Sequence, residues 1–173
     1  NFISQMKVNK GSLLTFSTLA GGNPRLVLML YEIALNYKNL GRVESQFFSL
    51  LEELTPYFQA CTENLSPQQE KILIGIARCE TAITPSDIAR KLRIRVNIVT
   101  AQLNELEKKG FVRFIRKDRK KKGKKLSFYD LRESIYRYWY LAGTETGKAP
   151  VRMFIKFIAL WYSEPELMRY QEM

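Results

Sequence analysis

The chain contains no histidine among its 173 residues. Histidine is the commonest general base and the commonest metal ligand, so Ser–His–Asp and Cys–His catalysis are excluded. The two cysteines, Cys61 and Cys79, are too few for a disulfide framework, and each lies on the apolar side of a helical pattern. We interpret both as small core residues in a reducing, cytoplasmic setting. We expect neither a catalytic centre nor a metal site in this chain.

Long apolar runs are also missing. Uncharged apolar stretches such as Leu26–Tyr31 are far too short to cross a membrane, and no signal-peptide pattern is present. We therefore expect no membrane partner. The first residue is Asn1 rather than Met, and Ser163–Glu166 has the pattern of one more helix start. We expect the chain to be part of a longer protein.

Positive charge is unevenly distributed along the sequence. The net charge is +11, yet residues 1–65 carry five basic and five acidic side chains, and residues 133–173 also carry five of each. Residues 66–132 carry eighteen basic and seven acidic side chains, so the whole excess belongs to this middle segment. Charge confined to one segment indicates a polyanionic partner for that segment.

The first third of the chain has the apolar spacing of amphipathic helices. Ser12–Ala20 is predicted as a short helix, and Asn23–Pro24 predicts the start of a second helix, which Gly41 is expected to end in a left-handed conformation. From Val43 to Leu65 apolar residues recur every three or four positions. Thr55–Pro56, a predicted cap followed by a helix-starting proline, divides this pattern into two helices.

Two further helix starts come next in the chain. Ser66 and Thr84 are predicted caps, each followed by proline, and Gln69 stands at the capping-box position relative to Ser66. A third helix is predicted from Val96 to Lys109 and is expected to stop at Gly110. Its inward-facing residues are predicted to be Val96, Val99, Leu103 and Leu106.

The period then changes to one typical of strands. Phe111–Arg116 and Leu126–Tyr129 are β-rich, and the charged tip Lys117–Lys125 contains a glycine, so the segment predicts a hairpin. Three helices and a hairpin over about 65 residues are the plan of a winged helix-turn-helix. Helices are also predicted at Glu133–Ala142 and Val151–Tyr162. The expected fold class is mainly α, with one β-hairpin in a winged helix that helical segments flank.

The basic hairpin and the third helix are candidate nucleic-acid contacts. Lysine and arginine number nine within Arg113–Lys125, against one aspartate, and such a tip can lie along a phosphate backbone. Polar side chains of the third helix are expected to face base edges. The candidate DNA-binding residues are Arg95, Asn97, Thr100, Gln102, Arg113, Arg116, Lys117, Arg119, Lys120, Lys121, Lys122, Lys124 and Lys125. A lysine-rich tip can also be only a solvated loop, and winged helices also serve as protein-docking modules.

Three segments carry a resemblance to a known group of proteins. GGNPRLVLMLYEIAL resembles the segment that opens the helical lid of AAA+/STAND-type ATPases, and Leu54–Ala77 resembles the segment immediately after that lid in the prokaryotic members. Tyr129–Tyr140 resembles the passage after the wing in the same proteins. The resemblance implies that Arg25 is a sensor-2-like residue that contacts a nucleotide, with ATP and Mg²⁺ held by a preceding ATPase domain.

A phosphate-binding loop is absent, since the sequence has no GxxxxGK[ST] motif. The chain alone is therefore not expected to hydrolyse ATP. We divide it into a lid-like segment (1–62), a winged helix (63–131) and a closing helical segment (132–173). The main hypothesis is a DNA-binding regulatory region whose partners are DNA and its own ATPase domain. The alternatives are a protein-interaction or autoinhibitory module of that ATPase and a free-standing MarR-like regulator, against which the GGNPR helix argues.

Overall fold

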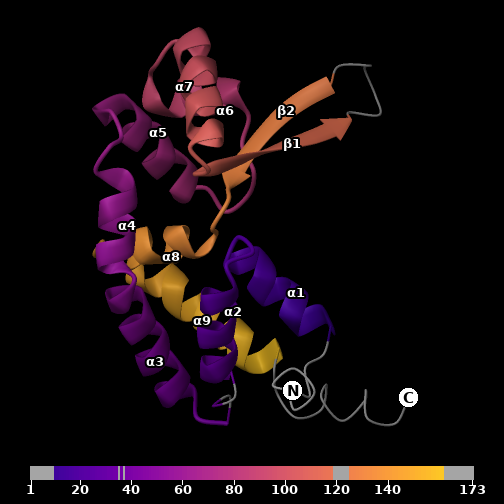
Figure 1. The fold of residues 1–173 in the computed structure, drawn as a ribbon, viewed down its shortest axis with the longest axis vertical. Coiled ribbons are helices and arrows are strands. Elements are labelled where there is room, and N and C mark those ends of the chain that lie inside the picture. The colour runs from indigo at the N-terminus through magenta and orange to yellow at the C-terminus, as the bar shows by residue number, and fades with distance from the viewer. Residues whose placement is uncertain (1–9, 35, 37, 119–124, 162–173) are drawn as a thin grey trace. The chain divides into compact units, whose positions relative to one another are not determined.

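The computed structural model describes residues 10–34, 36, 38–118 and 125–161. The described residues are mainly helical with a two-stranded antiparallel hairpin, which confirms the predicted fold class (Figure 1). It divides into two compact units, and each is described separately. The helical unit comprises Asn1–Glu53 and Ala142–Met173, and the winged-helix unit comprises Leu54–Leu141. The expected division at residues 62/63 and 131/132 stays a prediction, although residues 54–62 and 132–141 group with the winged helix.

The described part of the helical unit contains α1 (Lys10–Leu19), α2 (Pro24–Ala34), α3 (Leu40–Glu53) and α9 (Lys148–Trp161). Between α1 and α2 the chain turns through Gly21 and Gly22, whose φ angles of 59° and 85° lie in the left-handed region that glycine adopts without a steric penalty. The predicted cap of α2 is confirmed, because Asn23 Oδ1 accepts a hydrogen bond from the Arg25 amide at 3.1 Å.

The core of the helical unit lies between α3 and α9, which are distant in sequence. Phe47 and Val151 are almost fully buried, and the ring centroids of Phe47 and Phe154 are 5.8 Å apart. At the edge of this contact Arg152 Nε donates to Glu44 Oε1 at 2.7 Å. The unit is thus closed by a helix from the C-terminal part of the chain.

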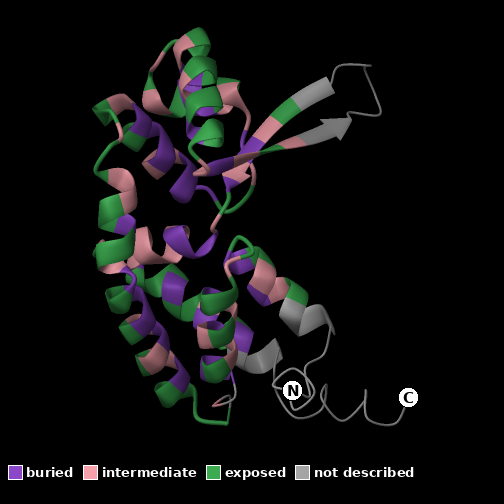
Figure 2. Ribbon diagram, viewed as in Figure 1, coloured by how far each residue is buried: buried purple, intermediate pink, exposed green. Residues whose placement is uncertain are grey.

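The winged-helix unit is built from α4 (Thr55–Thr62), α5 (Pro67–Ala77), α6 (Pro85–Leu92), α7 (Val96–Lys108), β1 (Val112–Asp118), β2 (Lys125–Leu131) and α8 (Ile135–Ala142). Figure 2 shows buried positions along α5 and at the base of both strands. Both predicted caps are confirmed. Ser66 and Gln69 form a complete capping box at α5, and Thr84 Oγ1 accepts from the Asp87 amide at 3.2 Å at α6.

The hairpin pairs β1 with β2 in an antiparallel register that runs from Val112 opposite Leu131 to Asp118 opposite Lys125. A third, short segment joins it, because Ile83 and Tyr129 exchange two backbone hydrogen bonds of 2.9 and 2.8 Å. This bridge fastens the α5–α6 connection to β2. Both strands extend further toward the tip than the β-rich runs predicted.

Helices α4 and α8 pack through aromatic rings. Phe58 lies 5.1 Å from both Tyr136 and Trp139, measured between ring centroids, and Trp139 Nε1 donates to Thr55 Oγ1 at 3.0 Å. The hydroxyl of Thr55 is used in this contact, and the residue before it, Leu54, is the N-cap of α4 without a side-chain cap. The prediction that Thr55 caps this helix is therefore wrong by one position.

Two other local predictions are wrong. Gly41 does not end a helix, because α3 begins at Leu40 and Asn39 Oδ1 caps it by accepting from the Arg42 amide at 3.0 Å. Val96 is not an inward residue, since 48% of it is exposed at the first position of α7. The predictions for Ser163–Glu166 and for the hairpin tip 119–124 fall outside the described residues.

Candidate nucleic-acid interface

Helix α7 is held by its apolar face against the rest of the winged-helix unit. Val99, Leu103 and Leu106 are each 0% exposed. The turn before it is sharp, because Arg93 closes α6 in the left-handed conformation (φ 55°, ψ 45°). Helix α7 stops before Gly110, as predicted, and this glycine has a φ angle of 83°. These constraints fix which face of α7 points to solvent.

The sequence-predicted residues of α7 lie on different parts of its surface. Arg95, Asn97 and Thr100 are exposed, whereas Gln102 is half-buried toward the flank. Thr100 Oγ1 donates to the Val96 carbonyl at 2.9 Å, so this hydroxyl is partly used within the helix. Arg95 is the N-cap of α7 and makes no capping bond with its side chain. The structure therefore brings Arg95, Asn97 and Thr100 to the exposed side, and Gln102 only to its margin.

Arg113 does not stand free at the base of the wing. Its Nη2 lies 3.3 Å from Asp130 Oδ2, its partner in the strand register, and Arg137 Nη2 lies 3.1 Å from the other oxygen of the same carboxylate. The Nε atoms of both arginines are buried and have no hydrogen-bond partner among the described residues. Arg113 thus pairs across the two strands, and the same carboxylate of Asp130 joins the hairpin to α8 through Arg137.

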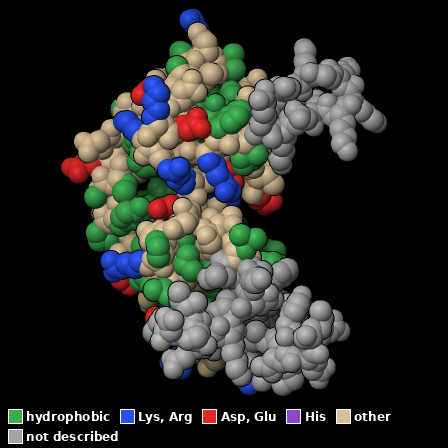
Figure 3. Space-filling view, turned by 45° about the vertical axis from the view of Figure 1, so that its right-hand side comes forward, with side chains coloured by type: hydrophobic (Ala, Val, Ile, Leu, Met, Phe, Trp, Pro, Cys, Tyr) green, Lys and Arg blue, Asp and Glu red, His purple; other side chains and the backbone are tan. Residues whose placement is uncertain are grey.

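The remaining wing residues differ in how far the structure describes them. The backbone of Arg116, Lys117 and Lys125 lies in the paired strands. Arg119, Lys120, Lys121, Lys122 and Lys124 lie outside the described residues. In Figure 3 the basic side chains of the described surface are interspersed with acidic ones, so no single continuous basic patch is seen on that face. In the sequence, the densest run of positive charge is the hairpin, where residues 113–125 include nine basic side chains.

Ion pairs reduce the effective charge of α7 near its C-terminus. Lys108 Nζ lies 2.8 Å from Glu105 Oε1, and this pairing lowers the pKa of Glu105 and raises the pKa of Lys108. Both groups are exposed, so the pair contributes little to stability.

Burial, with a smaller contribution from Glu107, raises the pKa of Tyr129 on β2, so its hydroxyl stays protonated at neutral pH.

Arg25, the sensor-2-like residue, lies in the first turn of α2 in the helical unit. Its side chain is 80% exposed, and Nη2 is 3.4 Å from Glu53 Oε1. Helix N-termini attract anions, because their amide groups and the helix dipole favour negative charge. The geometry leaves the guanidinium accessible, with Glu53 as its partner.

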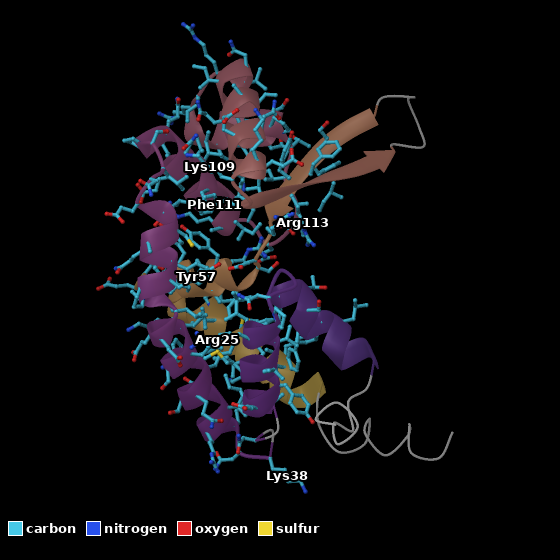
Figure 4. All side chains as sticks on the ribbon, viewed as in Figure 1. Arg25, Lys38, Tyr57, Lys109, Phe111 and Arg113 are labelled. Atoms are coloured by element: carbon cyan, nitrogen blue, oxygen red, sulfur yellow. The ribbon has the colours of Figure 1, made fainter. Side chains whose placement is uncertain are left out.

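A small cavity was not foreseen from the sequence. It measures about 110 Å³ and lies in the winged-helix unit; Figure 4 labels three of its lining residues, Tyr57, Lys109 and Phe111. Tyr57 donates to Glu133 Oε1 at 3.0 Å, and burial raises the pKa of Glu133 although this hydrogen bond opposes the rise. No local sequence pattern indicates that Tyr57 and Glu133 form a pair, because the two residues are 76 positions apart.

The sequence also led us to expect no disulfide framework, no metal site and no membrane span, and each of these can be compared with the described residues. Cys79 is buried and Cys61 half-buried, and both are free thiols. Within residues 10–34, 36, 38–118 and 125–161 no cluster of three acidic or cysteine side chains is placed to hold a metal ion. The helices of this part of the chain are all too short or too polar to cross a membrane.

The helices α5, α6 and α7 with the hairpin define a winged helix-turn-helix domain. Residues 65–122 match the family model described as the MarR family, which is about a third of the chain. No curated protein and no solved structure matches the chain. The comparisons support a MarR-like winged helix, and none of them links the chain to an AAA+ or STAND ATPase.

Proposed function

We propose that this chain is a DNA-binding regulator that contacts the phosphate backbone of duplex DNA through its hairpin and the base edges through α7. The observation that carries the proposal is the separation of charge between the units. The winged-helix unit holds nineteen basic and nine acidic side chains, a balance of +10, which leaves +1 for the helical unit. Neutralising phosphates with such a segment releases condensed counterions and drives binding.

The similarity of residues 65–122 to the MarR family supports the same function. In helix-turn-helix domains the second helix of the motif lies in the major groove, and here that helix is α7. The hairpin comes directly after α7 in the chain, so its basic residues belong to the same winged helix. The protein-docking alternative requires an acidic protein surface in place of phosphate, and it predicts no binding to nucleic acid.

The test is a titration with duplexes of unrelated sequence at several salt concentrations. Four phosphate contacts predict a slope of about −4 for log affinity against log salt. Changing Lys120, Lys121, Lys122, Lys124 and Lys125 to alanine is expected to flatten this slope and weaken binding to every duplex. A control variant removes five exposed charges elsewhere, by changing Lys38, Arg42, Lys71, Lys148 and Lys156 to alanine, and is expected to keep the slope. Absence of binding at low salt contradicts the proposal and favours protein docking.

A second candidate function concerns Arg25. The resemblance of its segment to an ATPase lid, together with its exposed position in the first turn of α2, supports contact with a nucleotide held by another domain. In a protein that joins this chain to an ATPase domain, Arg25→Ala is expected to slow ATP turnover on the order of a thousandfold, as for other transition-state arginines. Arg42→Ala, an exposed arginine of α3, is the control that keeps turnover. Unchanged turnover in Arg25→Ala contradicts this role.

A further inference from the structure

The outward face of α7 is a narrow stripe. Asn97, Ala101, Asn104 and Lys108 succeed one another at steps of four, three and four residues, and all four are exposed. This spacing places them along one side of the helix, opposite the buried residues of its apolar face. A helix that enters the major groove presents such a stripe to the base edges.

The first half of the stripe carries groups that suit adenine and thymine. Among the described residues no partner engages the exposed amide of Asn97, and an asparagine amide forms two hydrogen bonds with N6 and N7 of adenine. Ala101 lies one turn further on and offers an exposed methyl group. Small apolar side chains contact the C5 methyl group of thymine.

The groups that suit guanine and cytosine lie at the C-terminal end of the stripe, in an exposed ion pair. Guanine is recognised by arginine or lysine, and the lysine of this stripe, Lys108, is paired with Glu105 at 2.8 Å. The same pair occupies Glu105, whose carboxylate is the group that accepts from the cytosine amino group. Arg95 lies at the N-cap, where helix ends contact phosphate.

Asn104 is oriented by the hairpin. Tyr129 on β2 donates from its hydroxyl to Asn104 Oδ1 at 3.4 Å. The amino group of Asn104 is then the end left to face a base, and it can donate to thymine O4, to adenine N7, or to O6 or N7 of guanine. This contact disfavours only the cytosine amino group, so it does not by itself discriminate A·T from G·C.

We infer that α7 selects A·T base pairs in the major groove, with Asn97 on adenine and the methyl group of Ala101 on thymine. Because base contacts by α7 require that the winged helix binds duplex DNA, this preference depends on the function proposed above. A good two-bond contact discriminates between bases by about 5- to 150-fold.

The experiment compares three duplexes of equal length with the full chain at one salt concentration: A·T, G·C and inosine·cytosine. Inosine·cytosine presents the G·C pattern in the major groove but lacks the guanine amino group in the minor groove, as A·T does. We expect tighter binding to A·T than to the other two, by about tenfold or more. A duplex with uracil in place of thymine, which lacks only the C5 methyl group, is expected to bind less tightly than A·T.

Substitutions on and off the stripe test whether the A·T preference comes from these side chains of α7. Asn97→Ala is expected to lower the ratio of A·T to G·C affinity to the part that the thymine methyl contact supplies, and Asn97→Arg is expected to raise the ratio of G·C to A·T affinity, because arginine binds guanine. Gln59→Ala removes an exposed amide from α4 and is expected to keep the A·T preference. Arg95→Ala is expected to weaken binding to all duplexes by the same factor.

The outcomes separate the preference from the proposed function. Salt-sensitive binding that is equal for A·T and G·C overturns the preference and leaves the proposed function in place. Inosine·cytosine binding as tightly as A·T also overturns it, because the minor groove is then the source of the discrimination. Absence of binding to every duplex at low salt overturns both.

Discussion

At the scale of single residues, Arg93 is the non-glycine residue with positive φ in the described part of the chain. The left-handed conformation costs an L-residue about 1–2 kcal/mol, and glycine recovers this at an entropic cost of about 0.5–1 kcal/mol. Arg93→Gly is therefore expected to raise the free energy of unfolding by up to about 1 kcal/mol, measured by urea denaturation. Arg93→Ala removes the same charge but keeps the strain, so it should show no gain. An alanine variant more stable than the glycine variant would contradict this account.

The pair of Tyr57 and Glu133 predicts a dependence of stability on pH. Burial raises the pKa of Glu133 in the folded state, so the folded protein holds this proton more tightly than the unfolded chain does. This contribution to stability is complete below the unfolded pKa, about 4.5, and is lost as the pH rises through the folded pKa. Glu133→Gln keeps an acceptor for the Tyr57 hydroxyl and has no charge to bury.

Because the pKa of Glu133 is raised in the folded state, the wild type is expected to lose stability relative to Glu133→Gln as the pH rises. Urea midpoints of the wild type and Glu133→Gln, compared between pH 4 and pH 8, are expected to diverge in favour of the glutamine variant as the pH rises. A matched variant, Glu63→Gln, changes an exposed carboxylate of the same unit and is expected to show no such trend. Parallel curves for wild type and Glu133→Gln would refute the role of burial.

At the scale of elements, the capping box at α5 is the best-defined helix start. Ser66 Oγ accepts from the Gln69 amide and Gln69 Oε1 accepts from the Ser66 amide, both at 3.2 Å, while Lys109 Nζ donates to the same Gln69 oxygen at 3.1 Å. Ser66→Ala leaves one of these amides unpaired and is expected to cost about 1 kcal/mol in the free energy of unfolding. Ser49→Ala, on the exposed side of α3, is the control and should be neutral within about 0.5 kcal/mol. Equal losses in both variants would exclude a specific role for the cap.

The sequence predicted those elements whose signals are local. Ser66 and Thr84 each combine a capping side chain with a following proline, and such a combination leaves little choice of helix start. The signals that failed were those with a competitor, which is tertiary for Thr55 and local for Gly41. Thr55 uses its hydroxyl for Trp139, 84 positions away, and Asn39 starts α3 before Gly41 can end a helix.

For the candidate interface, periodicity placed Val99, Leu103 and Leu106 correctly but not Val96, because the first turn of a helix has no preceding turn to cover it. Ala101 was overlooked because an alanine carries no polar group, and only its exposure on the stripe makes it a candidate contact. The pairing of Arg113 with Asp130 and Arg137 was also beyond the sequence, since it depends on the register of the hairpin.

At the scale of the whole molecule, the two units differ in how their chain is connected. The winged-helix unit is one continuous segment, Leu54–Leu141, whereas the helical unit needs both ends of the chain. A continuous unit with its own buried core can fold alone. In the helical unit, Val151 and Ile155 of α9 are buried, so residues 1–53 alone lack a helix that covers their apolar faces.

A fragment of residues 54–141 is therefore expected to unfold in one cooperative transition in urea, whereas a fragment of residues 1–53 is expected to show a gradual loss of helical signal. Because the winged-helix fragment keeps +10 of the net charge, its salt slope for duplex binding should equal that of the full chain. A cooperative fragment with a flatter slope would show that the helical unit supplies phosphate contacts. A fragment 54–141 without a cooperative transition would show that α4–α8 need the helical unit to fold, and the division into two units would then fail as a description of stability.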